Sequence, residues 1–227
     1  MKKKLTIAAI LLLAVNGLIA QTTAPKFRFG IGGSTGYAWL KPTSKGLSSG
    51  DGQAAVGYGL MFDYNISDNY AISTGLDINY RGGNLTFDFA DTTKGAAKIN
   101  LQYLEIPLQL KMKTKAIGYF TYFAAFGGSI GYALSRTGNY GLIAMGTKKG
   151  IISIVDDKLT DYTNPVAVSL IINAGTEYNI SGKTSIVASL FFNNSFVDIL
   201  SNPVLAGVKY TTSSRANVLG IKIGVFF

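Results

Sequence analysis

Residues 27–40 read FRFGIGGSTGYAWL, a stretch in which bulky apolar side chains alternate with small or polar ones. One face of this stretch carries Phe27, Phe29, Ile31, Gly33, Thr35, Tyr37 and Trp39, and the other carries Arg28, Gly30, Gly32, Ser34, Gly36 and Ala38. Successive side chains of a β-strand point to opposite faces of the sheet. Alternation with period two therefore predicts a strand with one broad apolar face.

The same alternation returns in seven further stretches of the chain, at residues 56–66, 70–81, 104–112, 120–132, 166–179, 186–195 and 219–227. Glycine, serine, alanine and asparagine dominate the second face, where a soluble sheet would carry many lysines and glutamates. Small side chains suit the crowded lumen of a narrow barrel whose apolar face meets lipid. The pattern predicts an all-β protein, an eight-stranded antiparallel transmembrane up-and-down β-barrel. A soluble antiparallel sandwich is the alternative.

The connections between these stretches alternate in length. Short connections lie at residues 67–69, 113–118 and 181–183, and long ones lie at residues 41–53, 82–98, 135–165 and 198–214. Outer-membrane barrels have short periplasmic turns and long extracellular loops, so both termini are expected in the periplasm. Residues 85–89 and 151–155 are expected to extend hairpins above the membrane, although a ten-stranded barrel would also use them. Aromatic residues near strand ends fit the interfacial girdles of such barrels, namely Phe27, Tyr64, Tyr70, Tyr80, Tyr178 and Phe227.

The composition excludes several kinds of chemistry. The chain has 227 residues, of which 48% are apolar and 15% charged, and it has no cysteine and no histidine. Without cysteine there is no disulfide, no thiolate nucleophile and no thiolate metal site. Without histidine there is no imidazole to act as a base near neutral pH or to bind zinc. We therefore expect a protein that is not an enzyme and has no catalytic site, no cofactor and no metal site.

The carboxylates of the long connections are the remaining candidates for catalysis or metal binding at the rim of the barrel. They are Asp51, Asp88, Asp91, Asp156, Asp157, Asp161 and Asp198. Asp156, Asp157 and Asp161 could bind Ca²⁺, but no glycine-bent ligand loop or terminal glutamate follows them. Solvated loop charge is the favoured interpretation.

The N-terminal residues have the pattern of a secretory signal peptide. Lys2, Lys3 and Lys4 precede an apolar stretch at residues 5–15, and Ala20 ends a cleavage context. This predicts a signal peptide at residues 1–20 and an outer-membrane β-barrel domain at residues 21–227. A membrane anchor is the alternative, but the apolar run is shorter than the roughly 20 residues of a spanning helix.

The stretch at residues 103–111, YLEIPLQLK, resembles the Leu-Glu-Ile-Pro-Leu-x-Leu-Lys strand of the PorT-like outer-membrane β-barrel family of Gram-negative bacteria. The glycine-rich fifth stretch and the aromatic C-terminus are similar as well. Ser189, Leu190, Phe191 and Phe192 depart from the family, which has an Arg-Tyr pair followed by Gly-Leu there. The resemblance implies an eight-stranded barrel in the outer membrane, and the namesake of the family is linked to assembly of a secretion apparatus.

Eight charged residues project on the inward face of the expected barrel. They are Arg28, Asp63, Asp77, Arg81, Glu105, Lys111, Glu177 and Lys222, four basic and four acidic. Ions in a narrow lumen lose hydration and need partners, so we expect mutual salt bridges. The favoured interpretation is a polar plug that fixes the strand register. A gate is the alternative, in which pairs such as Asp77 with Arg81 or Glu105 exchange partners.

The expected partners follow from the location. Outer-membrane lipids contact the apolar face, and phosphates of lipopolysaccharide could contact the basic residues near the loops, which are Lys94, Lys98, Lys148, Lys149, Lys158, Lys209 and Arg215. Phe227, a C-terminal aromatic on the outward face, resembles the signal read by the barrel-insertion machinery. Secretion-apparatus components are a further possible partner. The net charge of +9 falls to +6 once Lys2, Lys3 and Lys4 are removed, and it is dispersed, so no nucleic-acid partner is expected.

The sequence thus favours a monomeric structural or interaction protein with a filled interior, whose contacts fall on the loop at residues 135–165. A small channel or transporter of the outer membrane is the second hypothesis. An envelope lipid-modifying enzyme is the third, and the lack of histidine disfavours it.

Overall fold

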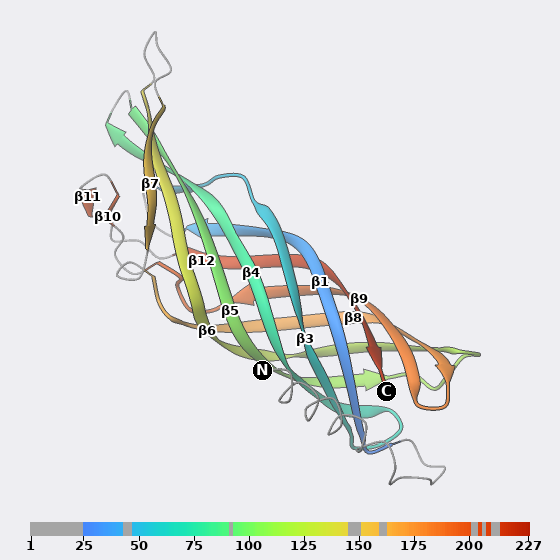
Figure 1. The fold of residues 1–227 in the computed structure, drawn as a ribbon. Coiled ribbons are helices and arrows are strands. Elements are labelled where there is room, and N and C mark those ends of the chain that lie inside the picture. The colour runs from blue at the N-terminus through green and yellow to red at the C-terminus, as the bar shows by residue number, and fades with distance from the viewer. Residues whose placement is uncertain are drawn as a thin grey trace, which may run out of the picture.

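A computed structural model shows the fold, with twelve strands in the part of the chain that it describes (Figure 1). The structure describes residues 25–42, 47–90, 93–144, 151–158, 163–200, 204–205, 208–209 and 214–227. The strands are β1 (Phe27–Pro42), β2 (Leu47–Ser49), β3 (Gln53–Asn65), β4 (Tyr70–Ala90), β5 (Thr93–Lys113), β6 (Phe120–Ala144), β7 (Ile151–Lys158), β8 (Val166–Ser181), β9 (Thr184–Ser195), β10 (Val204–Leu205), β11 (Val208–Lys209) and β12 (Ser214–Phe226). The expected signal peptide at residues 1–20 lies outside the described residues.

The sheet closes on itself to form a barrel. Its strands pair in the order β4-β3-β1-β12-β9-β8-β6-β5, and a further pairing of β4 with β5 completes the circle. The first and last barrel strands are antiparallel neighbours, from Gly30 opposite Phe226 to Pro42 opposite Ser214. Closure pairs the backbone groups that an open sheet would leave exposed at its edges. The prediction of an eight-stranded antiparallel barrel is confirmed.

The outer wall of the barrel is apolar. Large hydrophobic side chains point outward on every barrel strand, and Ile106 and Leu108 are 56% and 62% exposed. In a soluble sandwich these residues would be sealed between two sheets, so that alternative is wrong. Aromatic pairs gather near the short turns, where Phe27 contacts Tyr64 and Phe120 contacts Tyr178 with ring centroids 5.0 Å apart in both pairs. Among the described residues, no helix has the length and apolarity needed to cross a membrane.

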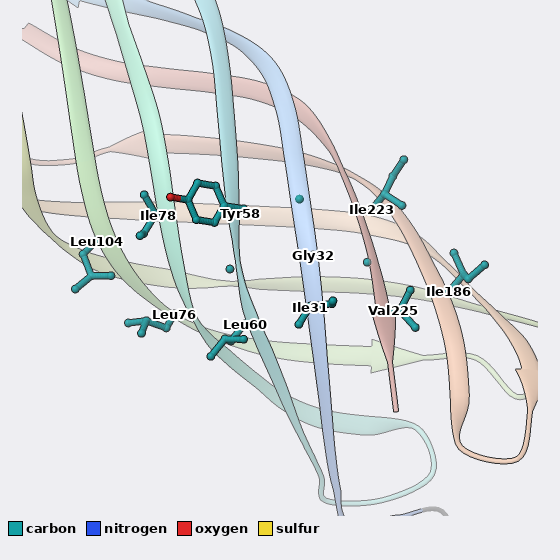
Figure 2. A pocket seen from close by; sticks show the side chains of 13 residues that line it. Ile31, Gly32, Tyr58, Leu60, Leu76, Ile78, Leu104, Ile186, Ile223 and Val225 are labelled. Atoms are coloured by element: carbon teal, nitrogen blue, oxygen red, sulfur yellow. The ribbon is translucent and has the colours of Figure 1, made fainter. Parts of the chain in front are cut away.

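The outer wall also carries a shallow apolar hollow of about 780 Å³. Its lining comes from six neighbouring barrel strands, and Figure 2 shows Leu104 of β5 and Ile186 of β9 at its two sides, with Ile31 of β1 and Leu60 of β3 between them. Gly33 lies in this hollow with an outward position and no side chain. Hydrocarbon chains of the bilayer are the natural solvent of such a surface.

The two ends of the barrel differ. The turns between β3 and β4, β5 and β6, and β8 and β9 are short, and they lie together with the C-terminus at the lower right of Figure 1. Gly118 and Gly182 have φ values of +63° and +56°, a left-handed conformation that suits glycine in tight turns. We call this the short-turn end and assign it to the periplasm.

The opposite end, the long-loop end, departs from the expected loops. The stretch at residues 82–98 is mostly strand, because β4 continues to Ala90 and β5 already begins at Thr93. β6 likewise continues to Ala144 and pairs with β7, while β2 pairs with β4. The strands β4 to β7 therefore rise beyond the rest of the barrel on one side (Figure 1). The expected hairpin extensions at residues 85–89 and 151–155 are present, and neither adds a strand to the closed barrel.

The approach of β1 to β12 provides a test of this packing. A β-carbon added to Gly36 would overlap the carbonyl oxygen of Leu219 and lie 2.6 Å from the Cα atom of Gly220. Gly36→Val should therefore lower the free energy of unfolding by about 1–3 kcal/mol, as overpacking does. Urea unfolding in detergent, followed by fluorescence of the single tryptophan Trp39, measures the change.

Gly33 offers the matched control on the same strand. A β-carbon there would face outward, with its nearest neighbour, the carbonyl oxygen of Gly57, 3.6 Å away. Gly33→Val should change the free energy of unfolding by less than about 0.5 kcal/mol, as surface substitutions do. Equal losses in the two variants would contradict the close packing of β1 on β12.

Candidate functional site in the barrel interior

The inward side chains near the short-turn end form a layer of ion pairs. Lys111 of β5 lies at its centre, with Nζ 2.7 Å from Asp63 Oδ2 and 2.5 Å from Glu177 Oε1. Arg28 of β1 donates from Nη1 to Glu177 Oε2 at 2.7 Å and from Nη2 to the hydroxyl of Ser185. These charged groups are buried, so each depends on its partners in place of water. We call Arg28, Asp63, Lys111 and Glu177 the ionic layer.

Two aromatic rings complete the ionic layer. The guanidinium of Arg28 lies 4.4 Å from the centroid of the Phe226 ring, and Lys111 Nζ lies 4.5 Å from the Phe123 centroid and 5.0 Å from that of Phe226. A cation over an aromatic face is attracted by the ring quadrupole. Alternation along the last strand places Phe226 inward, but no feature of the sequence indicates that its ring contacts two cations.

A second group lies in the middle of the barrel. Arg81 Nη2 is 2.5 Å from Glu105 Oε1, and both side chains are 2% exposed. Asn79 Nδ2 donates to the other carboxylate oxygen of Glu105 at 2.6 Å. The guanidinium of Arg81 also lies 4.6 Å from the centroid of the Tyr103 ring. Each charge is therefore held from two directions.

Asp77 pairs with Lys222 and not with Arg81. Lys222 Nζ of β12 lies 3.0 Å from Asp77 Oδ2, with side-chain exposures of 21% and 15% respectively. Asp77 and Arg81 are four residues apart on one strand, about 13 Å at the rise of a strand, which is too far for a pair. Glu105 stands opposite Asp77 in the register but carries the same sign of charge. The suggested exchange of Asp77 between Arg81 and Glu105 is therefore not the arrangement that the structure adopts.

The structure thus places all eight inward charges in the interior and gives each an oppositely charged partner. Between them remain small cavities of about 30, 50 and 60 Å³. Polar groups such as Asn173 and Asn193 line this space. Cavities of this size can hold a water molecule or two and no larger solute. Around the ion pairs, side chains therefore fill most of the interior that the structure describes.

An apolar cluster closes the long-loop end. Its buried members are Leu40, Leu47, Leu85, Ala97, Ile99, Leu101, Tyr103, Ala133, Ala167, Ile199, Leu200 and Ala216. Backbone hydrogen bonds hold the loops down over it, from Gly50 N to Asn84 O at 2.8 Å and from Ile199 N to Ser214 O at 2.7 Å. Sequence reasoning missed this cluster because Leu47 and Ile199 lie in stretches read as long connections, and Leu85 lies in a hairpin expected to extend above the membrane.

Most of the expected rim residues fall where side chains are not described. Asp88, Asp91, Asp156, Asp157 and Asp161 are among them, as are Lys94, Lys148, Lys149, Lys158 and Lys209. Asp198 and Arg215 lie together at the long-loop end, with Oδ1 and Nε 3.8 Å apart. Within the described ranges, no three acidic side chains gather closely enough to hold a metal ion.

Comparison with known proteins identifies the family. The family model described as "Outer membrane protein beta-barrel domain" matches residues 19–224. The chain belongs to this family. Members of the outer membrane protein β-barrel family reside in the outer membrane of Gram-negative bacteria, and that is the location of this chain.

Solved structures of other small outer-membrane proteins are similar to this family member. Neisserial surface protein A is 11% identical, with a TM-score of 0.44, and the match covers 90% of this chain and 99% of that one. OprG from Pseudomonas aeruginosa is 12% identical, with a TM-score of 0.45 and coverage of 87% and 95%. Ail of Yersinia pestis is 12% identical, with a TM-score of 0.35 and coverage of 88% and 99%. No curated protein matches the sequence.

The buried pair of Arg81 and Glu105 should be important for stability. Glu105→Gln leaves the buried guanidinium of Arg81 without a counter-charge, so the free energy of unfolding should fall by about 3–5 kcal/mol. Asp77→Asn removes the same charge from a pair that has more access to water, so it should cost less than Glu105→Gln. Urea titration of both variants in detergent measures the two losses. If Asp77→Asn were the more damaging change, the central role of the buried pair would be wrong.

Proposed function

We propose that the protein is a structural or interaction protein of the outer membrane that acts through its long-loop end and catalyses no reaction. The observation that carries the proposal is the occluded interior. The ionic layer fills one end and the apolar cluster covers the other, and the described residues between them enclose cavities of about 30 to 60 Å³. A filled eight-stranded barrel leaves its ends as the surfaces available for contact.

The rising strands β4 to β7 are the proposed contact surface. β7 pairs with β6 from Ile151 opposite Ile143 to Lys158 opposite Thr137, so backbone hydrogen bonds order this hairpin beyond the closed barrel. Its other edge pairs with no strand of the described residues. An unpaired strand edge is a surface to which another chain can add a strand.

Deletion of the β6–β7 hairpin tests this proposal. Thr137 of β6 stands directly opposite Lys158 of β7, so residues 138–157 can be replaced by an Asn-Gly turn that joins the two neighbouring strands. The variant should keep its resistance to urea but lose its cross-links to neighbouring proteins on the surface of living cells. Identical cross-links with and without the hairpin would place the contact elsewhere.

Conductance separates this proposal from the alternative of a small channel or transporter. The filled interior predicts no sustained conductance in planar bilayers for the natural chain. A channel gated by exchange of ion-pair partners would instead show salt-dependent conductance that changes in the Glu105→Gln variant. Such currents would favour the channel over the interaction protein.

Within the family, we propose that the chain is of the PorT-like type and has a link to protein secretion. The stretch at residues 103–111 supports this assignment, and it lies on β5, where Glu105 and Lys111 both serve the interior ion pairs. The departure at Ser189, Leu190, Phe191 and Phe192 lies on β9. Cross-linking to components of a secretion apparatus in the native cell would support the link.

The two ends of the barrel also suggest partners in the envelope. Lys98 and Arg215 are exposed at the long-loop end, where phosphates of lipopolysaccharide are within reach.

We propose the barrel-insertion machinery as the partner of the C-terminal strand. Phe227 is 50% exposed, and its backbone N–H donates to the carbonyl oxygen of Phe29 at 2.7 Å.

A C-terminal tag tests the role of Phe227. A polar tag appended after Phe227 should lower the amount of folded protein in the outer membrane severalfold, because the aromatic residue is no longer terminal. A tag of the same length inserted between Lys148 and Lys149 is the control, since it leaves the last strand intact. Equal membrane yields would count against an insertion signal at Phe227.

A further inference from the structure

The short-turn end opens into a cavity that neither the family nor the proposed function explains. It has a volume of about 490 Å³, and its walls come from the three short turns and from residues just before β1. Its floor is formed by Arg28 and Glu177 of the ionic layer. The cavity is therefore a cup that is open to the periplasm and closed toward the membrane. We call it the periplasmic cup.

The periplasmic cup has an excess of positive charge. Arg28, Lys113, Lys115 and Lys183 line it, against two acids, Asp68 and Glu177. Arg28 and Lys111 both contact the carboxylate of Glu177, so the charges of Arg28 and Glu177 cancel. The excess comes from the remaining three lysines of the lining, against Asp68. Lys113 donates from Nζ to Asn65 Oδ1 at 2.6 Å, and this neutral amide does not cancel its charge. A negatively charged ligand would neutralise this excess of positive charge.

Hydrogen bonds fix the wall that carries Lys113. Asn69 of the turn between β3 and β4 donates from Nδ2 to the carbonyl oxygen of Lys113 at 2.8 Å, and its own carbonyl oxygen accepts from Lys113 N at 2.7 Å. Asn65 Nδ2 donates to the carbonyl oxygen of Pro25 at 2.7 Å, which holds the segment before β1 against the same wall. The position of the Lys113 backbone is therefore set before any ligand arrives, which lowers the cost of binding.

We propose that the periplasmic cup binds the carboxylates of an acidic, extended peptide segment of a periplasmic protein. A volume of about 490 Å³ accepts a few side chains but no folded domain, and the closed floor prevents the ligand from passing through. Lysine ammonium groups are compact point charges with several donors, which suits carboxylates approaching in more than one orientation. Pro25 and Ala116 add apolar wall that suits a peptide better than a bare inorganic ion. The site is separate from the proposed contact surface at the long-loop end.

Binding of a labelled peptide tests the proposal. The purified full chain in neutral detergent should bind a fluorescent hexaglutamate peptide, and fluorescence anisotropy gives the dissociation constant. The double substitution Lys113→Gln and Lys115→Gln should raise this constant about tenfold, a change of about 1.4 kcal/mol. Raising the salt concentration should also weaken binding, because exposed charges are screened.

The controls distinguish the cup from general attraction to a basic protein. Lys41→Gln removes an exposed charge from β1 at the opposite end and should leave the dissociation constant unchanged. A hexaglutamine peptide should not bind. Equal binding by the natural chain and the double variant, or by both peptides, would overturn the proposal.

Two further outcomes would change the ligand class. Competition by inorganic phosphate at the same concentration as the peptide carboxylates would show an unselective anion site. Loss of peptide binding on transfer from detergent to nanodiscs of anionic lipid would show that lipid head groups occupy the cup. Either result would overturn the assignment to a peptide. A urea titration of each variant verifies that it is folded.

Discussion

Hydrocarbon offers no partner to a backbone N–H or C=O group, and this constraint governs the rest of the structure. Pairing of β1 with β12 and of β4 with β5 leaves the closed sheet without an edge inside the membrane. Once the sheet is closed, its two faces have opposite tasks. Large apolar side chains cover the outside, where they meet lipid, and the narrow inside admits only small residues and a limited set of larger polar ones. Gly36 shows how little room the inside offers, because even a β-carbon at this position would overlap the backbone of β12.

The interior is organised in layers along the barrel axis. Near the periplasm, Lys111 joins carboxylates from β3 and β8, so a single ammonium ties together strands from opposite sides of the barrel. Arg81 and Glu105 link β4 with β5 in the middle, and Asp77 reaches Lys222 on β12. Toward the outside, the ion pairs give way to the apolar cluster. Charged groups in the interior thus act as cross-braces, because each would be costly to bury alone.

In a filled barrel the two ends are the surfaces on which partners can bind, and these ends are chemically different. The long-loop end presents backbone in the rising strands β4 to β7, whose outer edge can accept a partner strand. The short-turn end presents a charged cup in which Lys113 stands above a closed floor. The barrel between them is a rigid spacer of fixed thickness. The two proposals together assign the protein one partner on each side of the membrane.

The sequence by itself determined the eight barrel strands and their two faces, because period-two alternation is a local property of the chain. It did not show how far β4, β5 and β6 continue at the long-loop end. It also placed the inward charges, since each follows from the parity of its position. It could not assign their partners. Asp77 of β4 contacts Lys222 of β12 across the interior, and these two strands face each other only because the sheet closes. Nor could it find the apolar cluster of Leu47, Leu85 and Ile199, because no local pattern indicates that their three stretches contact one another. Their burial exists only because loops from distant parts of the chain meet over one barrel opening, and that meeting is decided by the tertiary structure.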